Sequence, residues 1–105
     1  MKYALRMPLC LLVATFASSH AYAEGNASNG KKLAESCAGC HGEDGNSAAP
    51  IFPKLAGQQP AYLAKQLHDF KSEKRNEPTM TAMSAPLSDA DIADLSAFYA
   101  ERKVK

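Results

Sequence analysis

Two cysteines and a histidine, spaced one helical turn apart, constrain this sequence more than any other feature. They form the run Cys37-Ala38-Gly39-Cys40-His41. Residues three and four positions apart lie on one face of a helix, so both thiols and the imidazole are expected to point the same way. Ala38 and Gly39 are small and let a bulky group approach the backbone. The spacing therefore predicts one site built by three neighbouring side chains.

This spacing is typical of the attachment of a c-type haem. Two thiols on one face can each add to a vinyl group on the same side of the macrocycle, and the adjacent imidazole then reaches the iron. We therefore expect one haem c, covalently attached through Cys37 and Cys40, with His41 as an axial iron ligand.

Three other uses of these residues fit less well. A thioredoxin-like dithiol needs a strand followed by a helix, which the sequence does not offer. A zinc site needs four ligands in a tetrahedral array. Cys37, Cys40, His41 and His68 are four candidates, but the adjacent Cys40 and His41 are poor co-ligands of one small ion. A disulfide between Cys37 and Cys40 closes too short a loop to stabilise a core.

The first 23 residues have the pattern of an export signal. Lys2 and Arg6 precede an apolar run over residues 9–17. In Ala21-Tyr22-Ala23, which follows, the first and third residues are small, as in a cleavage site. This order predicts a secretory signal peptide over residues 1–23, cut after Ala23. The apolar run is too short for the roughly 20 residues of a membrane-spanning helix, so an uncleaved anchor is the weaker interpretation.

Cleavage leaves a small and nearly neutral chain. The 105 residues carry 12 basic and 11 acidic side chains, and loss of Lys2 and Arg6 leaves 10 basic against 11 acidic in residues 24–105. No basic surplus points to nucleic acid. A domain of this size buries too little surface to be secure alone, and only Cys37 and Cys40 remain as cysteines. We expect the haem to complete the core.

Hydrophobic periodicity predicts an all-α domain. Helices are expected over residues 31–38, over residues 60–70 and after the N-cap Ser88. Glycines and prolines predict long loops over residues 42–53 and 74–86. Such loops are unusual in a small packed domain unless they wrap something other than protein.

The sixth position of the iron has three candidate ligands, Met80, Met83 and His68. Both methionines lie in the second predicted loop, where core packing explains a methionine less well than it does in a helix. His68 falls at the edge of the apolar stripe of its helix, and we interpret it as a surface or boundary residue. A thioether ligand raises the haem potential. The residues themselves leave Met80 and Met83 open.

Further runs connect the haem motif to a known family. They are Asp44-Gly-Asn-Ser-Ala-Ala-Pro50, Phe52-Pro-Lys-Leu-Ala-Gly-Gln58, Lys65-Gln-Leu-His-Asp-Phe70 and Leu87-Ser-Asp. With them the chain resembles a class I cytochrome c of the small bacterial monohaem type, and one half of the bacterial dihaem cytochromes c. The resemblance implies a cytochrome c domain over residues 24–105, with three main helices and long loops wrapped around one covalently bound haem.

The resemblance also implies roles for single residues. The first and last helices cross, so that Gly30 and Leu33 meet Leu95 and Tyr99. Counted back from Leu87-Ser88, the sixth iron ligand is Met80. A proline carbonyl accepts a hydrogen bond from the second ring nitrogen of His41. Pro50 matches that position, with Pro53 as the alternative.

An iron with both axial positions filled has no open site for substrate, which favours electron transfer over catalysis. We expect a soluble periplasmic electron-transfer protein, not an enzyme, that cycles between ferric and ferrous iron. Its expected partners are transient: a respiratory complex or dehydrogenase as donor and a terminal oxidase or reductase as acceptor. We expect no nucleic acid, no membrane anchor after cleavage, and a monomer or weak dimer. The alternatives are a haem domain with an open sixth position and a subunit of a larger oxidase or dehydrogenase.

Overall fold

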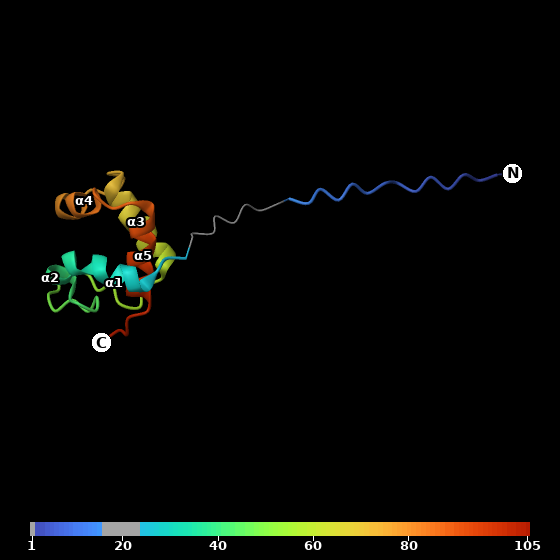
Figure 1. Cartoon of the computed structure of the whole chain (residues 1–105). Helices are drawn as coiled ribbons and strands as arrows, with labels where there is room; N and C mark the ends of the chain where they lie inside the picture. Colours follow the sequence, from blue (N-terminus) through green and yellow to red (C-terminus); the bar gives the residue numbers. More distant parts are fainter. Residues whose placement is uncertain (1, 16–23) are drawn as a thin grey trace.

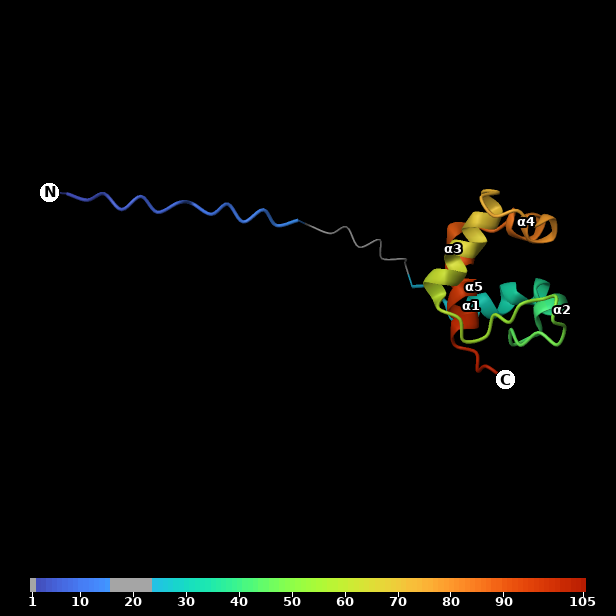
Figure 2. The same cartoon turned by 180° about the vertical axis from the view of Figure 1, so that it is seen from behind.

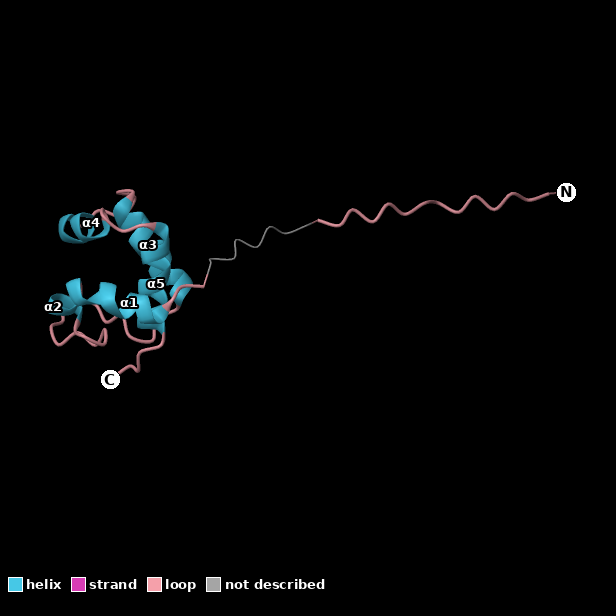
Figure 3. Cartoon of the chain, in the orientation of Figure 1, coloured by secondary structure: helices cyan, strands magenta, loops and turns pink. Residues whose placement is uncertain are grey.

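The computed structural model describes residues 2–15 and 24–105, so the predicted cleavage site Ala21-Tyr22-Ala23 lies outside the described residues. Within the described part, all regular secondary structure is helical (Figure 3), which confirms the all-α prediction. Residues 2–15 carry no regular secondary structure. None of the helices in the described ranges is long and apolar enough to cross a membrane.

In residues 2–15 and 24–105, five α-helices and one 3-10 helix make up the fold (Figures 1 and 2). The helices α3 (Pro60–Lys71) and α5 (Asp89–Ala100) are the longest. The shorter elements are α1 (Ala27–Leu33), η1 (Ala34–Ser36), α2 (Ala38–His41) and α4 (Pro78–Ser84). In Figure 1, α2 and α4 lie at the same end of the helical part of the chain.

The first helix begins earlier than its predicted start at residue 31. The Asn26 side chain caps α1 by accepting a hydrogen bond from the Asn29 backbone N–H at 2.9 Å. The predicted continuous helix over residues 31–38 is wrong, because the chain tightens into η1 after Leu33 and then starts α2. The haem motif therefore follows a short 3-10 turn.

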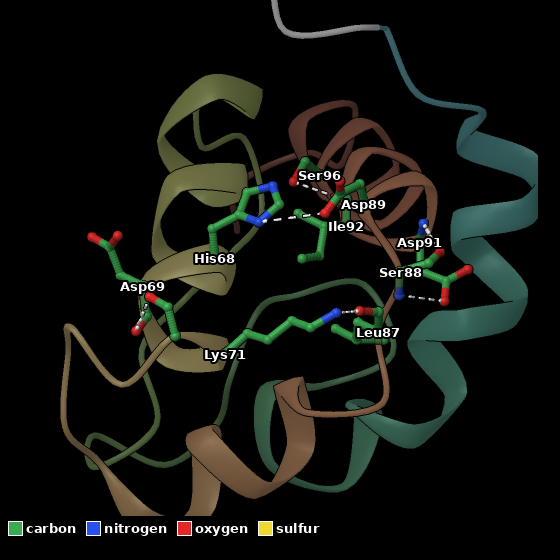
Figure 4. Close-up of polar contacts among 10 residues, drawn as sticks. His68, Asp69, Lys71, Leu87, Ser88, Asp89, Asp91, Ile92 and Ser96 are labelled. Atoms are coloured by element: carbon green, nitrogen blue, oxygen red, sulfur yellow. Dashed lines mark hydrogen bonds and ion pairs between the residues drawn. The ribbon is translucent and has the colours of Figure 1, made fainter.

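The last helix starts where the sequence predicts. Ser88 Oγ accepts from the Asp91 N–H, and Asp91 Oδ2 accepts from the Ser88 N–H, both at 3.0 Å (Figure 4). This capping box satisfies two donors that the first helical turn leaves unpaired.

The second predicted loop, over residues 74–86, is wrong because it contains α4. Pro78 is the first residue of α4, where a helix needs no backbone donor, so it starts the helix instead of breaking it. The Glu77 carboxylate accepts from the Met80 N–H at 2.7 Å and caps the helix. The segment that carries both candidate methionines is therefore helical.

The helices α1 and α5 cross in close contact at Gly30. A Cβ atom at Gly30 would lie 2.0 Å from the Asp94 carbonyl oxygen and 2.8 Å from the Phe98 Cβ. The crossing follows the resemblance: Gly30 approaches Asp94 and Phe98 most closely, and Leu33 packs against the cluster that contains Leu95 and Tyr99. Asp94 strengthens the crossing by accepting from the Asn26 N–H at 2.7 Å and from Asn29 Nδ2 at 2.6 Å.

The core lies between α1, α3 and α5. Its main cluster consists of Ala34, Leu63, Leu95, Phe98 and Tyr99, and Cys37 packs against this cluster. At the C-terminal end of α3, Lys71 Nζ donates to the Leu87 carbonyl and ties α3 to the segment that leads from α4 into α5 (Figure 4). The core is thus continuous with the first cysteine of the motif.

Candidate haem attachment site

The predicted one-turn arrangement of the two cysteines and the histidine is present. Cys37 is the N-cap of α2, and its carbonyl accepts from the Cys40 N–H at 3.3 Å and from the His41 N–H at 3.0 Å. Both thiols are free. Cys40 is exposed, whereas Cys37 is half-buried against the core. The two thiols are therefore available for thioether bonds from one short helical segment.

The His41 side chain is held in one orientation. Its residue is 7% exposed, and Nδ1 donates to the Pro53 carbonyl at 2.8 Å. The Phe52 ring packs edge-on against the imidazole, with ring centroids 6.3 Å apart. A carbonyl only accepts, so Nδ1 carries the proton and Nε2 keeps a lone pair for a metal. Contacts within the protein thus set the orientation of the His41 ring and leave Nε2 free to bind iron.

The acceptor for His41 is Pro53, so the prediction of Pro50 is wrong. The Phe52 N–H donates to the Ala49 carbonyl at 3.1 Å, which closes a turn with Pro50 in its second position. Pro50 is exposed in that turn. The chain then returns, held by the Leu55 N–H on the Gly45 carbonyl at 2.8 Å, and brings the Pro53 carbonyl to the imidazole.

Gly42 makes this return possible. The helix α2 ends there with φ +82°, a conformation that residues with a Cβ rarely adopt. A Cβ at Gly42 would also lie 2.9 Å from the Asn46 carbonyl oxygen. The glycine after the motif therefore lets the loop fold back beneath His41.

The two candidate methionines share α4 but differ in exposure. Met80 is half-buried near the start of the helix, and Met83 is 39% exposed one turn later. The third candidate, His68, lies elsewhere: its Nδ1 is 3.8 Å from Asp89 Oδ1 (Figure 4). These positions fit the interpretation of His68 as a boundary residue.

A groove of about 740 Å³ lies between α3 and α5, and it does not coincide with the motif. Its lining includes His68, Asp89 and several alanines, but neither cysteine nor His41. In residues 2–15 and 24–105, no three His, Cys, Asp or Glu side chains group as a metal ion would require. The site is therefore identified by the chemistry of its side chains, and the volume of the groove does not identify it. The four candidate zinc ligands of these described residues are not grouped around one point.

Three buried hydroxyl groups of the described chain have no hydrogen-bond partner: Thr81 Oγ1, Ser84 Oγ and the Tyr99 hydroxyl. Leaving a buried hydroxyl unpaired costs about 1–3 kcal/mol, so such groups are expected where a bound group supplies a partner. Two of them lie on α4 beside the methionines. Burial raises the pKa of the Tyr99 hydroxyl, and the Cys37 sulfur beside it raises that pKa further.

These features fit a haem. The free thiols would form the covalent bonds and His41 would supply a nitrogen ligand, while two of the three unpaired hydroxyls lie on α4 with the candidate methionines. Sequence patterns indicate the thiols and the histidine, but nothing in the sequence marks the three hydroxyls. Their significance follows from burial, which periodicity does not resolve for single atoms.

Comparison with known proteins agrees with this chemistry. Residues 27–101 match the model of the family described as Cytochrome c. The chain is 46% identical over 99 residues to cytochrome c4 of Pseudomonas aeruginosa, covering 94% of this chain and 49% of that protein. It is 39% identical over 82 residues to cytochrome c-554(548) of Halomonas halodenitrificans, covering 75% of this chain and 99% of that protein.

The fold agrees as well. The crystal structure of reduced recombinant cytochrome c4 from Pseudomonas stutzeri superposes with a TM-score of 0.74 at 43% identity, covering 77% of this chain and 47% of that one. The chain thus spans about half the length of the cytochromes c4 that it matches. A family match that runs from α1 past the end of α5, together with a histidine and two free thiols arranged for haem, shows that the chain belongs to the cytochrome c family, whose cofactor is covalently bound haem c.

Proposed function

We propose that residues 24–105 form a periplasmic electron-transfer domain that takes up and releases one electron at a time. The observation that carries this proposal is the preset proximal side, where Cys37 and Cys40 share one turn and the Pro53 carbonyl fixes His41. When bound, haem c supplies a reversible one-electron couple between ferric and ferrous iron. The signal peptide over residues 1–23 is part of the proposal, because haem attachment and export belong to the same compartment.

Each ligand has a defined task in this proposal. Cys37 and Cys40 anchor the haem, and His41 offers Nε2 to the iron. The Pro53 carbonyl raises the basicity of that imidazole by accepting the Nδ1 proton. Met80 offers its thioether as the sixth ligand and favours the ferrous state. With both axial positions filled, the chain turns over no substrate of its own.

The exposed side of the motif is the proposed route for electrons. Cys40 and Gly39 are both exposed, and a Cβ at Gly39 would meet no atom within 4 Å. A partner can therefore approach the attached haem here without displacing protein. Redox proteins dock over small surfaces and separate quickly. A chain this close to neutrality is expected to show weak electrostatic steering toward its donor and acceptor.

Visible spectroscopy of the exported protein tests the proposal. We expect sharp ferrous c-type bands, a ferric thioether–iron charge-transfer band and no change on adding carbon monoxide. Ready carbon monoxide binding would show an open iron and contradict electron transfer as the main role. Haem should stay with the polypeptide after denaturation, and a Cys37→Ala/Cys40→Ala double variant should lose it.

Two matched variants assign the sixth ligand. Met80→Ala should lose the charge-transfer band, bind carbon monoxide and lower the potential, because the thioether no longer favours ferrous iron. Met83→Ala removes an identical side chain from the same helix and should leave all three properties unchanged. The reverse result would assign the ligand to Met83.

A further inference from the structure

The Tyr99 hydroxyl is a polar group that neither the core nor the proposed ligand set explains. Tyr99 is 4% exposed, and its hydroxyl has no hydrogen-bond partner in the described chain. Its neighbour Phe98 is equally buried and packs edge-on against it, with ring centroids 5.1 Å apart. A phenylalanine at position 99 would fill the same space, so the hydroxyl needs a separate reason.

The Tyr99 ring belongs to the part of the core that packs against the attachment site. Tyr99 is fixed at its backbone, where its carbonyl accepts from the Gly57 N–H at 3.0 Å. The loop after the motif covers the ring closely, because a Cβ at Gly45 would lie 2.8 Å from the Tyr99 Cδ1. Cys37 packs against the core cluster that contains Tyr99. The Cys37 sulfur also raises the pKa of the Tyr99 hydroxyl, which places the first attachment cysteine beside that hydroxyl.

The sulfur of Cys37 changes when haem is attached. A free thiol is both a weak donor and a weak acceptor, whereas a thioether can only accept. The Tyr99 hydroxyl is a donor, so haem attachment makes the sulfur a better-matched partner. Hydrogen bonds around a haem are one of the ways in which a protein sets its potential.

We propose that Tyr99 is a positioning residue for the haem, whose hydroxyl donates a hydrogen bond to the Cys37 thioether sulfur. A donor at this sulfur draws electron density from the edge of the macrocycle and stabilises the electron-rich ferrous state. The proposal rests on haem attachment through Cys37. It does not depend on which methionine binds the iron or on which partners exchange electrons.

The test is a redox titration of the haem-loaded Tyr99→Phe protein, followed by absorption. Loss of the donor should shift the ferric–ferrous equilibrium about three- to tenfold toward ferric iron, which lowers the potential by about 28–59 mV for one electron. Tyr62→Phe is the matched control, because Tyr62 lies on α3 and is 48% exposed, and its potential should not change.

Thermal unfolding of the same loaded proteins separates the alternatives. If the hydroxyl stays unpaired with haem present, Tyr99→Phe will keep the potential and unfold at the same or a higher temperature, which overturns the proposal. An unchanged potential with lower stability also overturns it, because the hydroxyl then bonds to protein or water. In the ferrous wild-type protein, we expect a slowly exchanging Tyr99 hydroxyl proton with nuclear Overhauser contacts to the Cys37 thioether. Absence of that resonance would count against the bond even if the potential moved.

Discussion

Substitution of Gly30 by alanine tests the contact on which the packing of α1 against α5 depends. The added Cβ would lie 2.0 Å from the Asp94 carbonyl oxygen, 2.6 Å from the Asp94 carbonyl carbon and 2.8 Å from the Phe98 Cβ. No side-chain rotation relieves this clash, because two of the three atoms are backbone. Restoring even 3.0 Å to the nearest atom requires the helices to separate by about 1 Å at this point.

The expected cost follows from two opposing effects. Overpacking a core contact typically costs about 1–3 kcal/mol, and a backbone clash belongs at the upper end. Alanine is about 0.5–1 kcal/mol better than glycine inside a helix. The free energy of unfolding should therefore fall by about 2 kcal/mol. In a domain of this size, each kcal/mol lowers the melting temperature by roughly 4–8 °C, so a decrease of about 8–16 °C is expected.

Circular dichroism of the haem-loaded proteins during heating measures this change. Lys31→Ala is the control, because it places an alanine at the next position of α1, where the side chain is exposed and outside the crossing with α5. Its melting temperature should stay close to that of the wild type. If Gly30→Ala melts within about 3 °C of the wild type, α1 and α5 do not approach as closely as described, and the reasoning fails.

Two further predictions concern polar contacts at the ends of helices. The backbone N–H of Asn26, and then the Asn29 side chain, lower the pKa of Asp94 below 3.8, so its contribution to stability is present above that pH and disappears as the pH falls through the lowered value. Asp94→Asn should therefore melt below the wild type at pH 6, and the difference should shrink in melts recorded below pH 3.8; a constant difference would contradict this linkage. Glu77→Ala removes the side-chain cap of α4 at Met80 and should speed amide hydrogen exchange in α4 about fivefold, as expected for a loss of about 1 kcal/mol, with exchange in α5 unchanged. Equal exchange in α4 of both proteins would show that the cap contributes nothing.

The sequence predicts best where one local interaction decides the structure. Ser88 followed by Asp91 predicts the start of α5, because both partners of the capping box lie within four residues. The turn from Cys37 to His41 is local in the same way. Its spacing predicts the cofactor, because only neighbouring thiols and an imidazole are required.

Prediction fails where a distant contact or a competing local signal decides. Pro78 is a helix breaker within a helix but a good first residue, and only the Glu77 cap distinguishes the two cases. The choice between Pro50 and Pro53 depends on the return of the loop to Gly45, which no local pattern encodes. The burial of the Tyr99 hydroxyl depends on the packing of α5 against the loop at Gly45 and against Cys37, which are distant in the sequence.

The two sides of the proposed haem site, the His41 side (proximal) and the α4 side (distal), differ in how many protein contacts fix them. On the proximal side, His41 is buried, its ring is fixed by Pro53, and the motif continues into the core through Cys37. On the distal side, α4 has seven residues, and it carries two buried hydroxyls without partners.

A helix as short as α4 is not stable by itself, because helices below about 12–15 residues are marginal in water. Its cap at Glu77 and the Lys71 contact to Leu87 tie down its two ends, but neither satisfies the hydroxyls between them. We therefore expect the His41 side of the site to be formed before haem is attached, and α4 to become more stable once its proposed ligand, Met80, is bound. The haem would then attach to a side of the site that is already formed. The helix that carries the sixth ligand would be the last element to be stabilised.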